Sequence, residues 1–75
     1  MGTKTDIRYQ ISEISIVRIT VYDLLGREVA VLVNEKKDPG NHTVRFDGTG
    51  LASGVYLYRM TAGRFVETRK MLLLR

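Results

Sequence analysis

The stretch Val21–Val33, "VYDLLGREVAVLV", decides the fold because its apolar residues fit either one face of a helix or two strands around a turn. The residues just before it settle the choice. In residues 16–22, apolar β-branched side chains alternate with Arg18, Thr20 and Tyr22, and this period of two is typical of a strand. We therefore predict a β-hairpin over this stretch.

The centre of the hairpin is expected at the tetrapeptide "DLLG". Asp23 suits the first position of a type I turn, where its side chain can bond the backbone, and Gly26 suits the fourth, where positive φ is easiest. Strand character resumes over residues 28–33. We expect Leu24 and Leu25 to lie over the end of the folded domain.

The same alternation predicts the remaining strands. Residues 34–40 form a polar connection that ends in Pro-Gly, and residues 55–60 are apolar on both faces, as in a central strand. Val44 and Phe46 are expected to point inward. Further strands are predicted at residues 7–11, 42–47, 55–60 and 65–74. Six or seven short strands with turns about every 8 to 12 residues indicate an all-β antiparallel sandwich or small barrel.

The length of 75 residues allows one domain with a small core, for which we expect roughly 4–11 kcal/mol of stability. The absence of cysteine excludes a disulfide framework. The apolar run at residues 71–74 is too short to span a bilayer. Residues 1–6, "MGTKTD", are expected to be a leader or a truncated first strand, and residues 7–75 the domain.

The net charge of +4 is concentrated in the last third of the chain, because the charges of residues 1–54 balance. The excess comes from Arg59, Arg64, Arg69, Lys70 and Arg75 against Glu67. This pattern fits either an anionic partner or solvated strand faces, and we favour the second.

The sequence contains few residues that could act in catalysis or bind a metal ion. His42, the single histidine, is expected to be exposed, and no neighbouring serine or carboxylate forms a nucleophile and base with it. Asp23, Glu28 and Asp47 are scattered among turns, and the loop at residues 48–54 lacks the ending of a phosphate loop. We predict no catalytic residue, metal, cofactor or small-molecule substrate.

Nucleic-acid binding is a weaker alternative. Aromatic and basic residues interleave as in a stacking platform for single strands, at Tyr56, Tyr58, Arg59, Arg64 and Phe65. With two Phe, four Tyr and no Trp, however, the core needs most of these rings. A small basic barrel that binds single-stranded nucleic acid therefore stays as the alternative.

The hairpin stretch and the segment "PGNHTVRFDGTGLASGVYLYRMTAGRFVETRKMLLLR" together resemble a known family. They are similar to the type A C-terminal sorting domain of cargo proteins of the bacterial type IX secretion system, which is related to the immunoglobulin-like domain of the flagellar hook-capping protein. The resemblance covers about residues 7–75. It implies an immunoglobulin-like sandwich of six to seven strands.

The resemblance also implies a non-catalytic module that directs a cargo protein through the periplasm and the outer membrane to the cell surface. Its partners would be the outer-membrane secretion machinery and a sortase-like peptidase that links the cargo to anionic lipopolysaccharide. The Gly-x-Tyr motif of the family falls on Gly54 and Tyr56, for which we expect structural roles, as for Asp23 and Gly26 in the turn. The terminal motif, which we expect to recognise the partner, falls on Lys70, Met71, Leu72, Leu73, Leu74 and Arg75.

One departure from the family concerns the start of the chain. Family members usually begin with a proline-asparagine-proline segment that forms the first strand, and "MGTKTD" stands there in this sequence. A missing strand would leave an edge unpaired, which favours a homodimer or strand exchange. A spacer or accessory domain of a surface protein is the remaining alternative.

Overall fold

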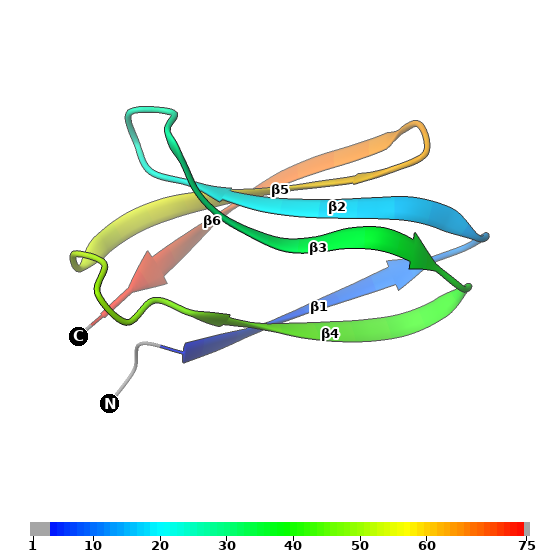
Figure 1. Ribbon diagram of the computed structural model, residues 1–75, viewed down its shortest axis with the longest axis horizontal. Helices are drawn as coiled ribbons and strands as arrows, with labels where there is room; N and C mark the ends of the chain where they lie inside the picture. Colours follow the sequence, from blue (N-terminus) through cyan, green and yellow to red (C-terminus); the bar gives the residue numbers. More distant parts are fainter. Residues whose placement is uncertain (1–3, 75) are drawn as a thin grey trace.

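The computed structural model describes residues 4–74 and contains six β-strands in that range (Figure 1). They form where apolar and polar side chains alternate along the chain. In chain order the strands are β1 (Lys4–Ile11), β2 (Ser15–Tyr22), β3 (Glu28–Lys37), β4 (Gly40–Asp47), β5 (Gly54–Ala62) and β6 (Phe65–Leu73). Within the described range, no helix is long and apolar enough to cross a membrane. The predicted all-β fold is confirmed.

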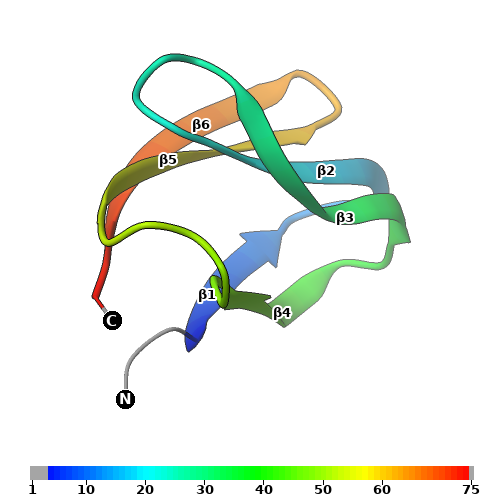
Figure 2. The same ribbon diagram turned by 60° about the vertical axis from the view of Figure 1, so that its left-hand side comes forward.

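The strands form two antiparallel sheets that face each other as the layers of a sandwich (Figure 2). One sheet has four strands in the order β3-β2-β5-β6, and the other pairs β1 with β4. The first strand begins at Lys4, opposite Asp47 of β4. Because the sheets differ in width, one flank of the wider sheet extends beyond the narrower one.

The core lies between the facing sides of the two sheets, here called their inner faces. Val17, Ile19 and Val21 of β2 point inward and are fully buried, and Phe46 of β4 packs from the other sheet with 2% of its surface exposed. Val44 packs against the buried side chains as well. The inward orientation predicted for Val44 and Phe46 is therefore confirmed.

Strand β3 is longer than the sequence pattern indicated. The polar connection predicted at residues 34–40 is wrong in its first half, because β3 continues to Lys37. These polar residues pair with the start of β2, from Arg18↔Asn34 to Ser15↔Lys37. Their side chains lie at an edge of the sheet, where polar residues are tolerated, so backbone pairing overrides the lack of apolar alternation.

Candidate partner-recognition surface

Strand β6 lies at the edge of the four-stranded sheet and carries most of the predicted recognition segment. It pairs with β5 along its whole length, from Ala62↔Phe65 to Gly54↔Leu73. Among the described strands, no neighbour lies on its other side. Edge strands present backbone N–H and C=O groups that a further strand can bind.

Burial alternates along the end of this strand. Leu73 is 3% exposed and belongs to the core, and Met71 is partly buried opposite Tyr56. Lys70 is exposed, as are Leu72 at 60% and Leu74 at 58%. Arg75 lies outside the described residues. The predicted segment therefore separates into residues that anchor the strand and residues that a partner can reach.

The seat of Leu73 is built by the loop between β4 and β5. Gly48 is buried there, and a Cβ added to it would lie 2.7 Å from both Cδ atoms of Leu73. Asp47 shapes the start of the loop by accepting hydrogen bonds from the hydroxyl of Thr49 at 2.6 Å and from its backbone N–H at 3.0 Å. These two bonds lower the pKa of Asp47. Only a residue without a side chain fits at position 48 while Leu73 stays in place.

The Gly-x-Tyr motif lies beside this seat. Tyr56 is 7% exposed, and its hydroxyl donates a 2.7 Å hydrogen bond to the carbonyl of Ala52, which ties the loop to β5. Gly54 is opposite Leu73 in the sheet and has a φ of 147°, which favours glycine. The contacts of both residues are with the loop and with β6, and these contacts hold the end of β6 in place.

The turn between β2 and β3 is held by hydrogen bonds that converge on Asp23. Its carboxylate accepts bonds from the backbone N–H of Leu25 and Arg27, both at 2.9 Å, and from the Arg27 side chain at 2.7 Å. The Gly26 N–H donates to its carbonyl, with Gly26 at a φ of 84°. Hydrogen bonding, first from the backbone of Arg27, lowers the pKa of the Asp23 carboxyl.

The two leucines of this turn do not cover the end of the domain as expected. Leu24 is 66% exposed and Leu25 is 78% exposed, so that expectation is wrong. The hydrogen bonds to Asp23 fix the backbone of the turn directly beyond β2, and this conformation directs both side chains into solvent. The turn, the loop at residues 48–53 and the end of β6 all lie at the same end of the long axis (Figure 1).

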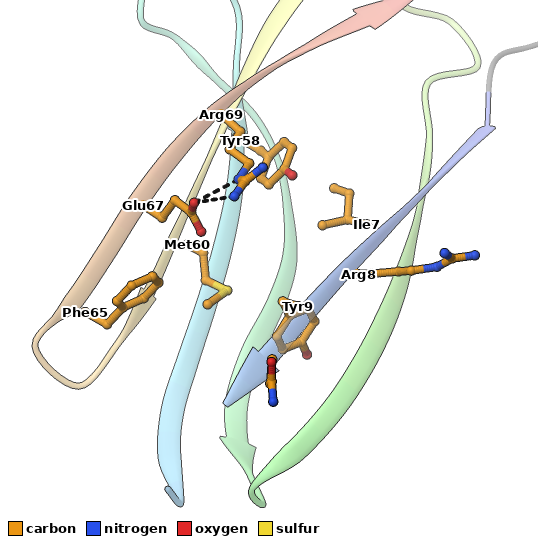
Figure 3. A pocket seen from close by; sticks show the side chains of 9 residues that line it. Ile7, Arg8, Tyr9, Tyr58, Met60, Phe65, Glu67 and Arg69 are labelled. Atoms are coloured by element: carbon orange, nitrogen blue, oxygen red, sulfur yellow. Dashed lines mark hydrogen bonds and ion pairs between the residues drawn. The ribbon is translucent and has the colours of Figure 1, made fainter. Parts of the chain in front are cut away.

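An open groove of about 280 Å³ lies between β1 and the inner face of β6 (Figure 3). Phe65, Glu67 and Arg69 line it from β6, and Ile7 and Tyr9 line it from β1. Glu67 accepts bonds from the Arg69 guanidinium at 2.6 and 2.9 Å, which raises the pKa of Arg69. The described residues that line the groove include no serine, threonine, cysteine or histidine beside the Glu67 carboxylate.

His42 is partly buried, so the expectation that it is exposed is wrong. It lies on the inner face of β4 and stacks on Tyr9, with 5.3 Å between the ring centres. Its Nε2 is 2.8 Å from the carbonyl oxygen of Asp38. Residues 4–74 contain no group of three or more His, Cys, Asp or Glu that could hold a metal ion.

The aromatic and basic residues of the predicted stacking platform do not share one surface. Tyr56 is buried and Tyr58 packs on the core from the inner face, whereas Arg59 is exposed on the opposite face of the same strand. Arg64 lies in the turn between β5 and β6. Within β5, alternation of sides separates Tyr56 and Tyr58 from Arg59, and Phe65 alone of the predicted rings is exposed, in the groove between β1 and β6. This arrangement argues against a platform of stacked bases formed by the five residues.

Comparison with known families gives one result for nearly the whole chain. The family model described as "Secretion system C-terminal sorting domain" matches residues 3–74. Neither the comparison with curated proteins nor that with solved structures finds a match. The matched range includes the hairpin turn, the loop at residues 48–53 and all six strands.

Proposed function

Because the chain belongs to the secretion system C-terminal sorting domain family, whose members are sorting signals for type IX secretion, we propose that its last strand is the element that the export machinery binds. A sorting domain implies a cargo protein that is secreted or carried to the cell surface, and contact with the secretion machinery. The family is not a catalytic one. The residues that make the contact are proposed to be the exposed ones of the terminal segment.

One observation carries this proposal, which is the alternation of burial in residues 70–74. Leu73 fixes the strand in the core, so Lys70 and Leu72 are held at defined positions on the outer face of the sheet. Leu74 follows them and is exposed. A fixed display of this kind lowers the conformational entropy that a partner must remove on binding.

The free edge of β6 supports strand addition as the mode of contact. An extended segment of the receptor that pairs with this edge would gain backbone hydrogen bonds, while Leu72 and Lys70 would supply side-chain contacts. Backbone pairing gives affinity without regard to sequence, and the exposed side chains give selectivity. This combination suits a signal that is attached to many different cargo proteins.

The test is export of a periplasm-directed reporter that carries residues 1–75 at its C-terminus, in a bacterium with type IX secretion. The variant Lys70→Ser/Leu72→Ser changes only exposed side chains and leaves Met71 and Leu73 in place. We expect the unchanged fusion to reach the surface or medium and the variant to remain in the periplasm. The matched control is Val66→Ser, a 53% exposed residue on the same face of the same strand.

Equal export of the fusion and the double variant would contradict recognition by the terminal segment. Loss of export in the Val66→Ser control as well would mean that any change to the outer face of β6 is harmful, which would also contradict it. Circular dichroism of the purified domains establishes that all variants are folded.

The further steps of the family are proposed for this chain as well. After transit through the periplasm and the outer membrane, a sortase-like peptidase would cut upstream of the domain and join the cargo to anionic lipopolysaccharide. The domain itself would catalyse no step. A pulse-chase experiment with the reporter fusion checks this order, because a lower-mass product must follow export and disappear in a strain without the peptidase.

A homodimer through β1 is proposed from the free edge of the narrower sheet. Antiparallel pairing of two β1 strands about Ile7 would place Asp6 of each copy opposite Arg8 of the other. Sedimentation velocity measures the dimer, and Arg8→Asp should weaken it by placing like charges opposite each other. A monomer at millimolar concentration would contradict this proposal.

A further inference from the structure

The outer face of the four-stranded sheet is apolar at one end and polar in its middle. Tyr22 pairs with Leu57, and Val55 pairs with Leu72, at the end of the sheet where the chain emerges from β6. Tyr22, Val55 and Leu57 are only partly buried, and Leu72 is 60% exposed. None of the described strands covers this face. Towards the middle of the sheet most outward residues are polar, and Val31 of β3, 42% exposed opposite Thr20, is the apolar one among them. The polar ones are Arg18, Thr20, Arg59, Thr61 and Thr68.

This apolar strip joins the two features already described at that end. From Leu72 it crosses Val55 and Leu57 to Tyr22, which is the last residue of β2 and directly precedes the turn with Leu24 and Leu25. We call the turn leucines, Tyr22, Leu57, Val55 and Leu72 the outer strip. It runs across the sheet from the β2–β3 turn to the C-terminal segment.

The exposed leucines of the turn have no role in its geometry. Asp23, Gly26 and the backbone supply the hydrogen bonds and the positive φ that the turn requires. The two central positions of a type I turn accept most residues and gain nothing from leucine. Leu24 and Leu25 are also absent from both core clusters. Two large apolar side chains are therefore held in solvent by a well-bonded backbone, and they extend a contiguous apolar surface of the kind that marks an interaction site.

We infer that the turn leucines are a second docking point for the type IX machinery, which contacts the domain along the outer strip as well as at Lys70–Leu74. This inference rests on the proposed function, because the strip is continuous with the terminal segment. Lys70 borders the outer strip, opposite Leu57, and makes no ion pair among the described residues. The partner surface is then an apolar groove with a carboxylate placed to meet Lys70.

The decisive variant is Leu24→Ser/Leu25→Ser in the C-terminal reporter fusion. Both positions are exposed and serine is accepted in turns, so the fold and its thermal stability should change little. We expect export to fall about tenfold, as for the loss of anchor residues in an interface. The matched control is Ile16→Thr/Val66→Thr, which removes two exposed apolar side chains from the opposite end of the same face. This control should export like the parent.

A competition experiment separates recognition from folding. The free 75-residue domain, overproduced in the periplasm, should reduce export of the parent fusion by occupying the machinery. The Leu24→Ser/Leu25→Ser domain should compete at least about tenfold less well, since it lacks an anchor. Undiminished competition by this variant would overturn the inference.

The outcomes distinguish the inference from the function on which it rests. Normal export of Leu24→Ser/Leu25→Ser together with failure of Lys70→Ser/Leu72→Ser would overturn the second docking point and leave terminal recognition intact. Normal export of both would overturn both. If the turn leucines instead bind a second copy of the chain, the parent domain would be a dimer by sedimentation and the leucine variant a monomer, which would also overturn the inference.

Discussion

Strands β5 and β6 are neighbours in one sheet and pair along their full length, yet they contribute differently to the core and to the surface. Among the strands that the structure describes, β5 lies between two neighbours and buries Tyr56 and Met60, whereas β6 has one neighbour and, of its own residues, buries only Leu73. Side chains of β5 are needed to complete the core, and most side chains of β6 are not. The comparison shows how a small domain can separate stability from recognition by giving each its own strand.

The largest effect is expected from Tyr56→Ala on β5. The change removes a buried ring and the hydrogen bond to Ala52, and we expect the free energy of unfolding to fall by about 3–5 kcal/mol. Chemical denaturation monitored by circular dichroism measures the loss. Tyr56→Phe, which keeps the ring, should cost far less. A small loss for Tyr56→Ala would mean that β5 is not the stabilising strand.

Leu73→Ala tests the most deeply buried side chain of β6 and should have the next largest effect. We expect a loss of about 2–4 kcal/mol, since the side chain is buried with Ile7 and Phe46. Hydrogen exchange should show faster opening of residues 70–73 than of β5. Equal protection of the two strands would contradict the difference drawn between them.

Gly48→Ala acts on the same anchor from the opposite side. The added Cβ would lie 2.7 Å from the Leu73 side chain, so Leu73 must shift, and we expect a loss of about 1–3 kcal/mol. A double-mutant cycle of Gly48→Ala with Leu73→Ala measures the coupling, because the alanine at 73 makes room for the new methyl group. Additive losses would show that the two residues do not contact each other.

A smaller effect is expected from pH, through the loop that seats Leu73. The pKa of Asp47 is lowered in the folded state from its ordinary value of 3.8, so its contribution is present above that value and is lost as the pH falls below it. Between about pH 5 and about pH 2, where carboxyl groups titrate, the parent domain should therefore lose more thermal stability than the Asp47→Asn variant does. Parallel curves would contradict a role for this carboxylate in holding the loop.

The smallest effect on stability is expected from Leu72→Ser, although this side chain lies directly beside Leu73. Because Leu72 is 60% exposed, the free energy of unfolding should change by about 0.5 kcal/mol or less. Export of the reporter should nevertheless fall. A large loss of stability here would remove the distinction between anchor and display residues in β6.

Much of this arrangement follows from periodicity in the sequence. The alternation in residues 16–22 and the Asp-Leu-Leu-Gly tetrapeptide predicted the first hairpin, and the apolar pattern of residues 55–60 predicted a central strand. The extension of β3 could not be predicted, because residues 34–37 are polar and are ordered by pairing with β2. Local patterns do not reveal such pairing.

The candidate surface was predicted only in part. The terminal motif identified residues 70–75 as the candidate recognition segment. Which of their side chains are exposed, however, depends on the register with β5. Val55 and Leu57 were not predicted as surface residues, although their position in a strand that is apolar on both faces was the available signal. Leu24 and Leu25 were expected to lie over the end of the domain, and only the bonded geometry of the turn shows them in solvent.

The pairing of β1 with β4 has a consequence for the order in which the domain folds. Asp6 and Arg45 form an ion pair across this sheet although they are 39 residues apart in the chain, whereas β2–β3 and β5–β6 are local hairpins. Long-range pairing costs loop-closure entropy before any contact is gained, so we expect the hairpins first and the long-range pairings β1–β4 and β2–β5 after them. Because Leu73 shares one core cluster with Ile7 of β1 and Phe46 of β4, the last strand acquires its final order only after those two strands have paired.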